Sequence, residues 1–173
     1  MFLPYEEAMS FIDGYKATLL EVLKSQGENQ TGRIVNDLAK ARSFVKNRPQ
    51  LIDEAIERIK SQGTPLSQVV EASIRSIRIG RWIYLRNTTK YALILDEKLT
   101  NAYAVKALTT PLHEVAGSKS AIFEAALFEY DGIFLCDGIV ANAIHIGPGL
   151  RSEFGEKYKS LKKLGHFYTQ CAA

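Results

Sequence analysis

Glu124, Asp137 and His145 are the side chains in this sequence best suited to acid–base chemistry or metal binding. The pair Asp131-Gly132 is typical of a two-residue hairpin turn. Such a turn would place Glu124 diagonally across from Asp137 on one face of the hairpin. Unbroken alternation along the second strand would bring His145 to the same face. The three residues would then form a polar island, which is the basis of the hypothesis of a small hydrolase-type enzyme.

The same segment allows a second interpretation. Asp137-Gly138 is itself a turn or bulge signal, and a bulge would move every later residue to the opposite face. His145 would then be a hydrogen-bonded strand residue outside the island. The sequence shows no recognisable pair of nucleophile and base, so a hydrolase ranks last among the hypotheses. No CxxC or His/Cys cluster is present, and we expect neither a metal nor a cofactor.

The segment IHIGPGLRSEF, residues 144–154, predicts a strand, a glycine turn and the start of a helix. Gly147 and Gly149 would let a ligand approach the backbone, and Arg151 lies where a helix exposes unpaired N–H groups. Pro148 removes one of these donors, and nearby glutamates already supply negative charge. The segment matches neither the P-loop nor the dinucleotide-binding motif. A plain turn is therefore favoured, with an anion site as the alternative.

Basic residues gather in two further segments. The run IRSIRIGRWIYLR combines arginines with aromatic residues, as proteins that bind single-stranded nucleic acid do. Arg75 and Arg78, three positions apart, are expected on one helix face, where they would equally suit the exposed side of that helix. The run KYKSLKKLGH adds lysines near a helix end. The candidates are Arg75, Arg78, Arg81 and Arg86, with Lys157, Lys159, Lys162 and Lys163.

The composition is typical of a soluble globular protein. The chain has 173 residues, of which 46% are hydrophobic and 24% charged, and its formal net charge is +3. This length suits one domain or two small ones, and the mild positive charge permits an anionic partner without requiring one. The two cysteines do not form a disulfide framework. No segment resembles a signal peptide or a membrane span, and we expect a cytoplasmic protein without a membrane partner.

The hydrophobic pattern changes near Gly80. Before this residue, apolar side chains recur at helical spacing, and glycines and prolines mark the ends of about four helices. We expect these helices to begin at Tyr5, Gly32, Pro49 and Pro65, the last running to about Gly80. Their short connections favour an antiparallel bundle.

After Gly80 the apolar residues cluster in strand-like runs, namely RWIYLRN, KYALIL, AYAVKAL, AIFEAALFEY and GIFLCDGIVANAIHI. With no helix between them, we expect an antiparallel, curled sheet of about five strands. The longest break, TTPLHEVAGSKS, can cross the end of this sheet. Residues 150–164 have helical spacing and form a C-terminal helix against it. The predicted fold is α+β, with a helical bundle at 1–80 and the sheet at 81–173, as two domains or around one shared core.

The favoured functional hypothesis is a non-enzymatic binding or regulatory module that binds another protein or a second copy of itself. Aromatic and aliphatic residues are plentiful, whereas no reactive constellation stands out. An RNA- or DNA-binding protein that uses the two basic segments is the first alternative. The small hydrolase is the second.

Overall fold

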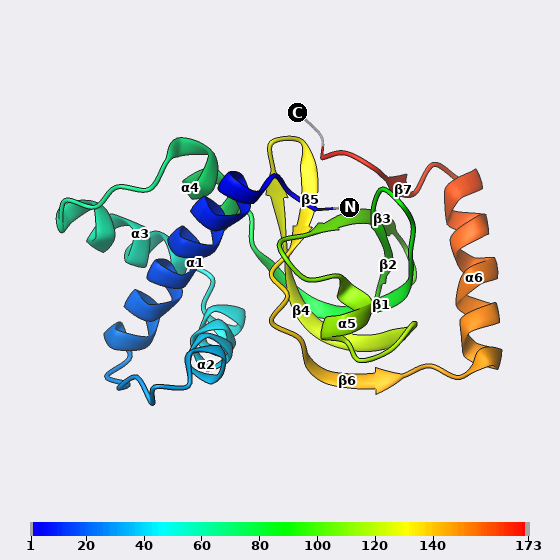
Figure 1. Cartoon of the computed structure of the whole chain (residues 1–173), viewed down its shortest axis with the longest axis horizontal. Helices are drawn as coiled ribbons and strands as arrows, with labels where there is room; N and C mark the ends of the chain where they lie inside the picture. Colours follow the sequence, from blue (N-terminus) through cyan, green and yellow to red (C-terminus); the bar gives the residue numbers. More distant parts are fainter. Residues whose placement is uncertain (1, 172–173) are drawn as a thin grey trace. The chain divides into compact units, whose positions relative to one another are not determined.

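The structure is a computed structural model that describes residues 2–171. It contains two compact units, which are described separately (Figure 1). The helical unit is Tyr5–Ile77, and the sheet unit combines residues 2–4 with residues 78–171. Helices come first, strands follow and a helix lies near the end, so the predicted α+β class is confirmed. The predicted domains, 1–80 and 81–173, lie close to these units and stay a prediction.

The spacing of apolar residues accounts for the helices of the helical unit. The structure describes every residue of Tyr5–Ile77. Their buried faces carry the expected apolar residues, for example Phe11, Leu19 and Leu23. The helices are α1 (Tyr5–Ser25), α2 (Ile34–Asn47), α3 (Leu51–Ser61) and α4 (Gln68–Arg75).

The last of these helices is shorter than the sequence predicts. It begins after Ser67, whose hydroxyl accepts a hydrogen bond from the N–H of Val70, rather than at Pro65. It ends at Arg75, and the prediction that it reaches Gly80 is wrong. Residues 78–84 are hydrogen-bonded to another strand along their whole length, and this pairing outweighs the local helical spacing.

Short β-rich runs form the sheet unit. Within residues 78–171 the helices are α5 (Leu112–Val115) and α6 (Pro148–Lys163). The strands are β1 (Arg78–Asn87), β2 (Ala92–Asp96), β3 (Ala102–Ala107), β4 (Ala121–Tyr130), β5 (Ile133–Cys136), β6 (Ala141–His145) and β7 (Phe167–Tyr168).

The first five strands close on themselves, which explains the predicted curl. Their order is β1-β2-β3-β5-β4, and β4 pairs back to β1. The order β4-β1-β2-β3 is that of a Greek key. A register shift between Tyr84 and Arg86 interrupts the β1–β2 ladder, as a bulge does where a strand bends. Strands adjacent in sequence pair antiparallel where they pair, but β3 pairs in parallel with β5 and β7. The sheet is therefore mixed rather than wholly antiparallel.

The β4–β5 hairpin turns as the sequence predicts. Asp131 and Gly132 both have positive φ, 44° and 75°, and Tyr130 pairs with Ile133. Of the two interpretations of the following segment, the break at Asp137-Gly138 is confirmed and the unbroken strand is wrong. Gly138 has a φ of 71° and separates β5 from β6, so alternation does not continue from one to the other.

The interior of the closed sheet is apolar. Trp82 is 7% exposed, and its Nε1 donates a hydrogen bond to the carbonyl of Ala125 (3.0 Å), so it belongs to the core. Leu112 and Ala116 pack into the same cluster. The segment around α5 therefore crosses one end of the closed sheet, as predicted (Figure 1).

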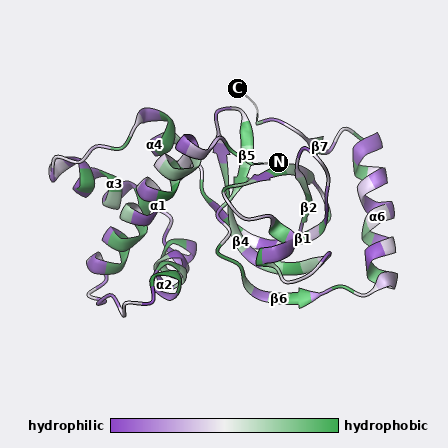
Figure 2. Cartoon of the chain, viewed as in Figure 1, coloured by the Kyte–Doolittle hydropathy of each residue, from purple (hydrophilic) through white to green (hydrophobic). Residues whose placement is uncertain are grey.

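The C-terminal helix α6 packs against the outer surface of the sheet. Tyr158 and Leu161 lie with Ile83 and Leu93 in a second apolar cluster. Much of the remaining α6 surface is hydrophilic (Figure 2). After α6, the chain returns along β3 as β7, and the ring of Phe167 lies 5.3 Å from that of Tyr158. These contacts hold α6 against the sheet through Tyr158 and Leu161.

The N-terminal residues also attach to β3. Phe2 forms a parallel bridge with Ala107, and the N–H of Leu3 donates to the carbonyl of Ala107 (3.3 Å). Leu3 is 5% exposed. The described residues before α1 therefore belong to the sheet unit, and the helical unit follows them in sequence.

The carboxylate of Asp96 organises the β2–β3 turn. It accepts hydrogen bonds from the backbone N–H and hydroxyl of Thr100, both 2.7 Å, and from Nδ2 of Asn101 (2.9 Å). Burial by itself would raise the pKa of Asp96, but the hydrogen bonds from Thr100 and Asn101 outweigh it. They hold the pKa of Asp96 below its usual value of 3.8.

Asp96→Asn should therefore destabilise the protein in a pH-dependent way. Because the pKa of Asp96 is lowered by folding, its stabilisation is complete above its unfolded-state pKa and is lost as pH falls through its folded-state pKa. We expect a loss of about 1 kcal/mol at neutral pH and almost none near pH 2, measured by urea unfolding. Asp131→Asn, in a turn that suits asparagine equally, is the control. A loss that is equal at both pH values would contradict this account.

Candidate anion-binding site

A cavity of about 690 Å³ lies within the sheet unit, between α6 and the end of β1. Its volume is in the range of small-molecule binding sites. None of the described residues that line it is acidic. The basic residues of its wall are Arg86, His113, Lys119, Arg151 and Lys159.

Three separate segments supply the Lys and Arg side chains of this wall. Arg86 follows the β1 bulge, and Lys119 lies in the loop between α5 and β4. Arg151 and Lys159 are on α6, eight residues apart, with Gly155 midway between them. Residues four apart share one side of a helix. The packing of α6 on the sheet therefore places these two side chains in the wall of the same cavity as Arg86 and Lys119.

The positive charge of this wall is largely uncompensated. Across residues 2–171, Arg86, Lys119 and Arg151 form no ion pair. Lys159 Nζ lies 2.7 Å from Glu156 Oε1, but both side chains are exposed, and such pairs contribute little. Four Lys and Arg side chains thus line one cavity in a chain whose whole net charge is +3.

His113 and Asn87 form a polar pair at the edge of the cavity. Asn87 Nδ2 lies 2.6 Å from His113 Nδ1, and an amide nitrogen can only donate. His113 Nδ1 is therefore the acceptor, which places the hydrogen of the neutral ring on Nε2. Asn87 Oδ1 is buried without a hydrogen-bond partner among the described residues. A half-turn of the amide would make Oδ1 the acceptor, so the direction of this hydrogen bond depends on the tautomer of His113.

Tyr84 and Tyr158 form the buried part of the wall. Burial raises the pKa of Tyr84 to about 12, and a hydrogen bond with the backbone of Asn87 offsets this only in part. Burial also raises the pKa of Tyr158, against the opposing effect of the nearby Arg86 charge. Both phenols are therefore neutral at physiological pH and leave the positive charge of the cavity intact.

Gly155 has no packing reason to be glycine. No atom lies within 4 Å of the position that a Cβ would occupy there. Glycine inside a helix costs about 1 kcal/mol relative to alanine. Gly155 lines the cavity between Arg151 and Lys159. The absence of a side chain leaves the backbone of α6 open to a ligand at this point.

The turn Gly147-Pro148-Gly149 contributes only one of its residues to the cavity. Gly147 is the residue before α6, and Pro148 is the first residue of the helix. Pro148 and Arg151 line the cavity, whereas Gly147 and Gly149 do not. Arg151 thus faces a cavity, as the anion-site alternative requires, but the two glycines predicted to cradle a ligand lie outside it.

The first two of the predicted arginines are separated by the fold. Arg75 ends α4, where its guanidinium pairs with Asp53, Glu57 and Glu71. Arg78 is the first residue of β1. The expectation that Arg75 and Arg78 share a helix face is therefore wrong, because the helix ends between them.

The remaining arginines differ in their partners. Arg78 Nη2 lies 3.0 Å from Glu129 Oε1, and Arg81 Nη1 lies 3.5 Å from Glu97 Oε1. Acidic residues therefore compensate Arg75, Arg78 and Arg81. Of the predicted arginine segment, Arg86 alone lines the cavity. The basic residues of this segment do not form one surface.

Asp137 has a structural role in the β4–β5 hairpin. It is 8% exposed, and its Oδ1 accepts hydrogen bonds from the N–H groups of Ala126 and Ile139, both 3.2 Å. A buried carboxylate that accepts backbone hydrogen bonds stabilises the end of the ladder. This arrangement is sufficient to explain an aspartate at this position.

The predicted polar island is not assembled as one group. On β4, Glu124 pairs with Ala141, whereas His145 pairs with Ala121, about 10 Å further along the strand. The break at Gly138 causes this, because β6 starts a new register. Among the described residues, no group of three His, Cys, Asp or Glu side chains could hold a metal ion.

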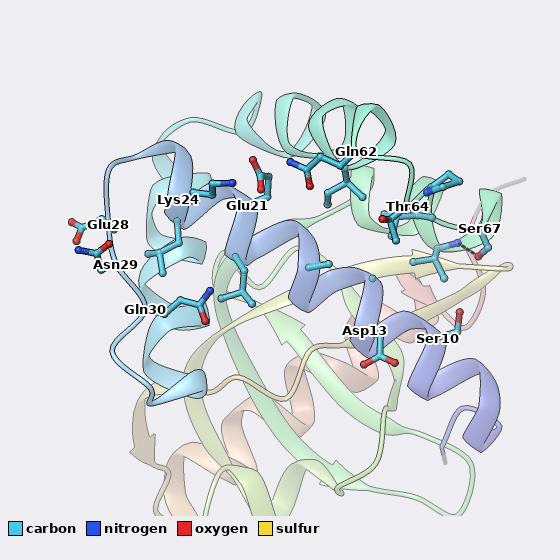
Figure 3. Close-up of a pocket in the computed structure, with 18 residues that line it drawn as sticks. Ser10, Asp13, Glu21, Lys24, Glu28, Asn29, Gln30, Gln62, Thr64 and Ser67 are labelled. Atoms are coloured by element: carbon cyan, nitrogen blue, oxygen red, sulfur yellow. Dashed lines mark hydrogen bonds between the residues drawn. The ribbon is translucent and has the colours of Figure 1, made fainter.

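A second cavity, of about 800 Å³, lies within the helical unit (Figure 3). Polar side chains of both charge signs surround it, among them Asp13, Glu21 and Lys24. Glu21 already pairs with Arg58 (3.2 Å). A Cβ on Gly14, in the wall, would lie 2.6 Å from Val70, so glycine is needed there for helix packing. This cavity therefore has no single charge preference.

Comparisons of this chain with protein-family models, curated proteins and solved structures find no match. None of the helices in residues 2–171 has the length and apolar character that a membrane span needs.

Proposed function

We propose that this protein is a non-enzymatic binding module that holds a phosphate-bearing ligand in the cavity between α6 and the sheet. The observation that carries the proposal is the wall of five basic side chains without an acidic one. Arginine binds phosphate oxygens in a bidentate manner, and lysine adds a point charge. The residues predicted for proton transfer, Glu124, Asp137 and His145, do not line this cavity, which supports binding rather than catalysis.

Phosphate suits the site better than an isolated carboxylate. Arg86, Lys119 and Arg151 provide more positive charge than one carboxylate can compensate. The volume of about 690 Å³ also exceeds the needs of a small anion. Leu85 and Leu93 give the wall an apolar part, as a ligand with an organic portion requires.

Association with a protein partner or a second copy has less support. The exposed large apolar side chains are spread over both units, namely Phe2, Tyr5, Ile34, Val35, Val69, Ile144, Leu150, Leu164 and Tyr168. Scattered apolar residues of this kind are normal on protein surfaces. Self-association stays a prediction, which sedimentation of the purified chain would test.

Titration with the dinucleotide d(pTpT), followed by amide NMR signals, tests the proposed site. We expect the largest shifts at residues 86–87, 113–119 and 148–159. Arg151→Ala should weaken binding about tenfold, because a hydrogen bond to a charged group contributes roughly 1.5–3 kcal/mol. Lys98→Ala is the matched control, since it removes one exposed cation from the same unit outside the cavity.

Two results would contradict the proposal. The first is a set of shifts confined to a different surface. The second is an equal effect of Arg151→Ala and Lys98→Ala, which would indicate attraction by overall charge rather than a site.

A further inference from the structure

Cations continue along α6 beyond the cavity. Arg151 and Lys159 line the cavity, and Lys162 follows three residues later, also exposed. Successive residues of an α-helix are rotated by about 100°, so these three side chains and Gly155 fall within an arc of about 80°. We call Arg151, Lys159 and Lys162 the α6 cationic stripe.

Other charged residues of α6 lie outside this stripe. Glu153 and Glu156 are about 200° and 140° around the helix from Arg151, and Lys157 is about 240° around it. Arg151 and Lys162 are separated by about 16 Å along the axis. Stacked nucleotides follow one another at about 3.4 Å per strand, so this length matches about five of them. The stripe is thus longer than a mononucleotide needs.

The cavity has the surfaces that one unstacked base needs. Leu85, Leu93 and the largely buried Tyr158 provide apolar contact, and Ser152 provides a hydrogen-bonding group. Gly155 leaves the helix backbone open to close approach. A duplex is too broad to enter a cavity of about 690 Å³, whereas a single nucleotide is not. Cations that follow a backbone beside such a surface are typical of single-strand binding.

We infer that the ligand of this site is single-stranded nucleic acid, with one nucleotide in the cavity and the following phosphates on the α6 cationic stripe. This inference rests on the proposed function and adds to it the length and strandedness of the ligand. Lys162 distinguishes a ligand confined to the cavity from a longer strand, because it belongs to the α6 cationic stripe but does not line the cavity. It contributes only when the ligand is long enough to leave the cavity.

Fluorescence anisotropy with labelled d(pTpT) and a labelled oligothymidylate dodecamer tests the inference. The dodecamer should bind at least about tenfold more tightly, with an affinity that falls with salt. Lys162→Ala should weaken binding of the dodecamer several-fold and leave the affinity for d(pTpT) unchanged. It should also lower the slope of log affinity against log salt concentration for the dodecamer by about 0.7. Lys157→Ala is the matched control on the far side of the same helix and should leave both ligands within about twofold.

The outcomes separate the two proposals. If neither ligand binds, or if Arg151→Ala is without effect on both, the proposed function itself fails. If d(pTpT) binds as tightly as the dodecamer, or Lys162→Ala and Lys157→Ala act alike, the cavity binds phosphate but the inference fails. Equal affinity for a duplex dodecamer, or for inorganic polyphosphate of similar length, would also overturn it.

Discussion

Gly155→Glu should stabilise the protein and abolish ligand binding in the cavity. Replacing a helix-interior glycine that contacts nothing gains about 1 kcal/mol of helix propensity. The introduced carboxylate can also pair with Arg151 and Lys159, each four residues away, for about 0.2–0.5 kcal/mol each. The same carboxylate lies where a phosphate would bind, and like-charge contact costs several kcal/mol, so affinity should fall by about 100-fold or more. Thermal unfolding and the d(pTpT) titration measure the two effects.

Gly155→Gln is the matched control for this experiment. It has nearly the same shape and helix propensity but no charge, so it should stabilise the fold by about 1 kcal/mol. Its effect on binding should be steric alone and clearly smaller than that of Gly155→Glu. Equal binding by the wild type and Gly155→Glu would show that the ligand does not occupy this part of α6. A glycine required by packing would instead show destabilisation in both variants.

Asp137→Ala should destabilise the sheet unit by about 2–4 kcal/mol. The substitution removes the acceptor of two backbone N–H groups, those of Ala126 and Ile139, next to buried residues. A buried donor left without a partner costs about 1–3 kcal/mol. Urea unfolding of the whole chain measures the loss.

Asp137→Asn separates the structural role of this residue from a catalytic one. Asparagine keeps Oδ1 as an acceptor, so most of the stability should remain. If the two variants lost equal stability, the account based on Oδ1 would be wrong. A hydrolase that used the Asp137 carboxylate would lose its activity in the folded Asn variant, which is the outcome that the hydrolase alternative predicts.

Local sequence signals were sufficient for much of the fold. The apolar face of α1 and the Asp131-Gly132 turn each depend on a few neighbouring residues, and the structure has both as predicted. The end of α4 and the parallel pairing of β3 with β5 depend on contacts far apart in the chain. Helical spacing near Arg78 was overridden by the ladder to β4, which no local pattern describes.

The same distinction holds for the candidate site. Arg86, Arg151 and Lys159 were candidates from their residue types, but their meeting requires α6 to return to the end of β1. Lys119 carries no local signal at all, because an isolated lysine in a loop is ordinary. Gly155 did carry a local signal, since an isolated glycine inside a helix is unfavourable and usually has a packing or functional role.

The attachment of the first described residues to β3 has a consequence for synthesis of the chain. Phe2 and Leu3 find their partner only at Ala107, after the whole helical unit and the first two strands. During translation, these residues are made before the helical unit and stay unpaired until β3 has been translated. A substitution that disturbs Phe2 or Leu3 would therefore act on the end of β3, about a hundred residues later in the chain.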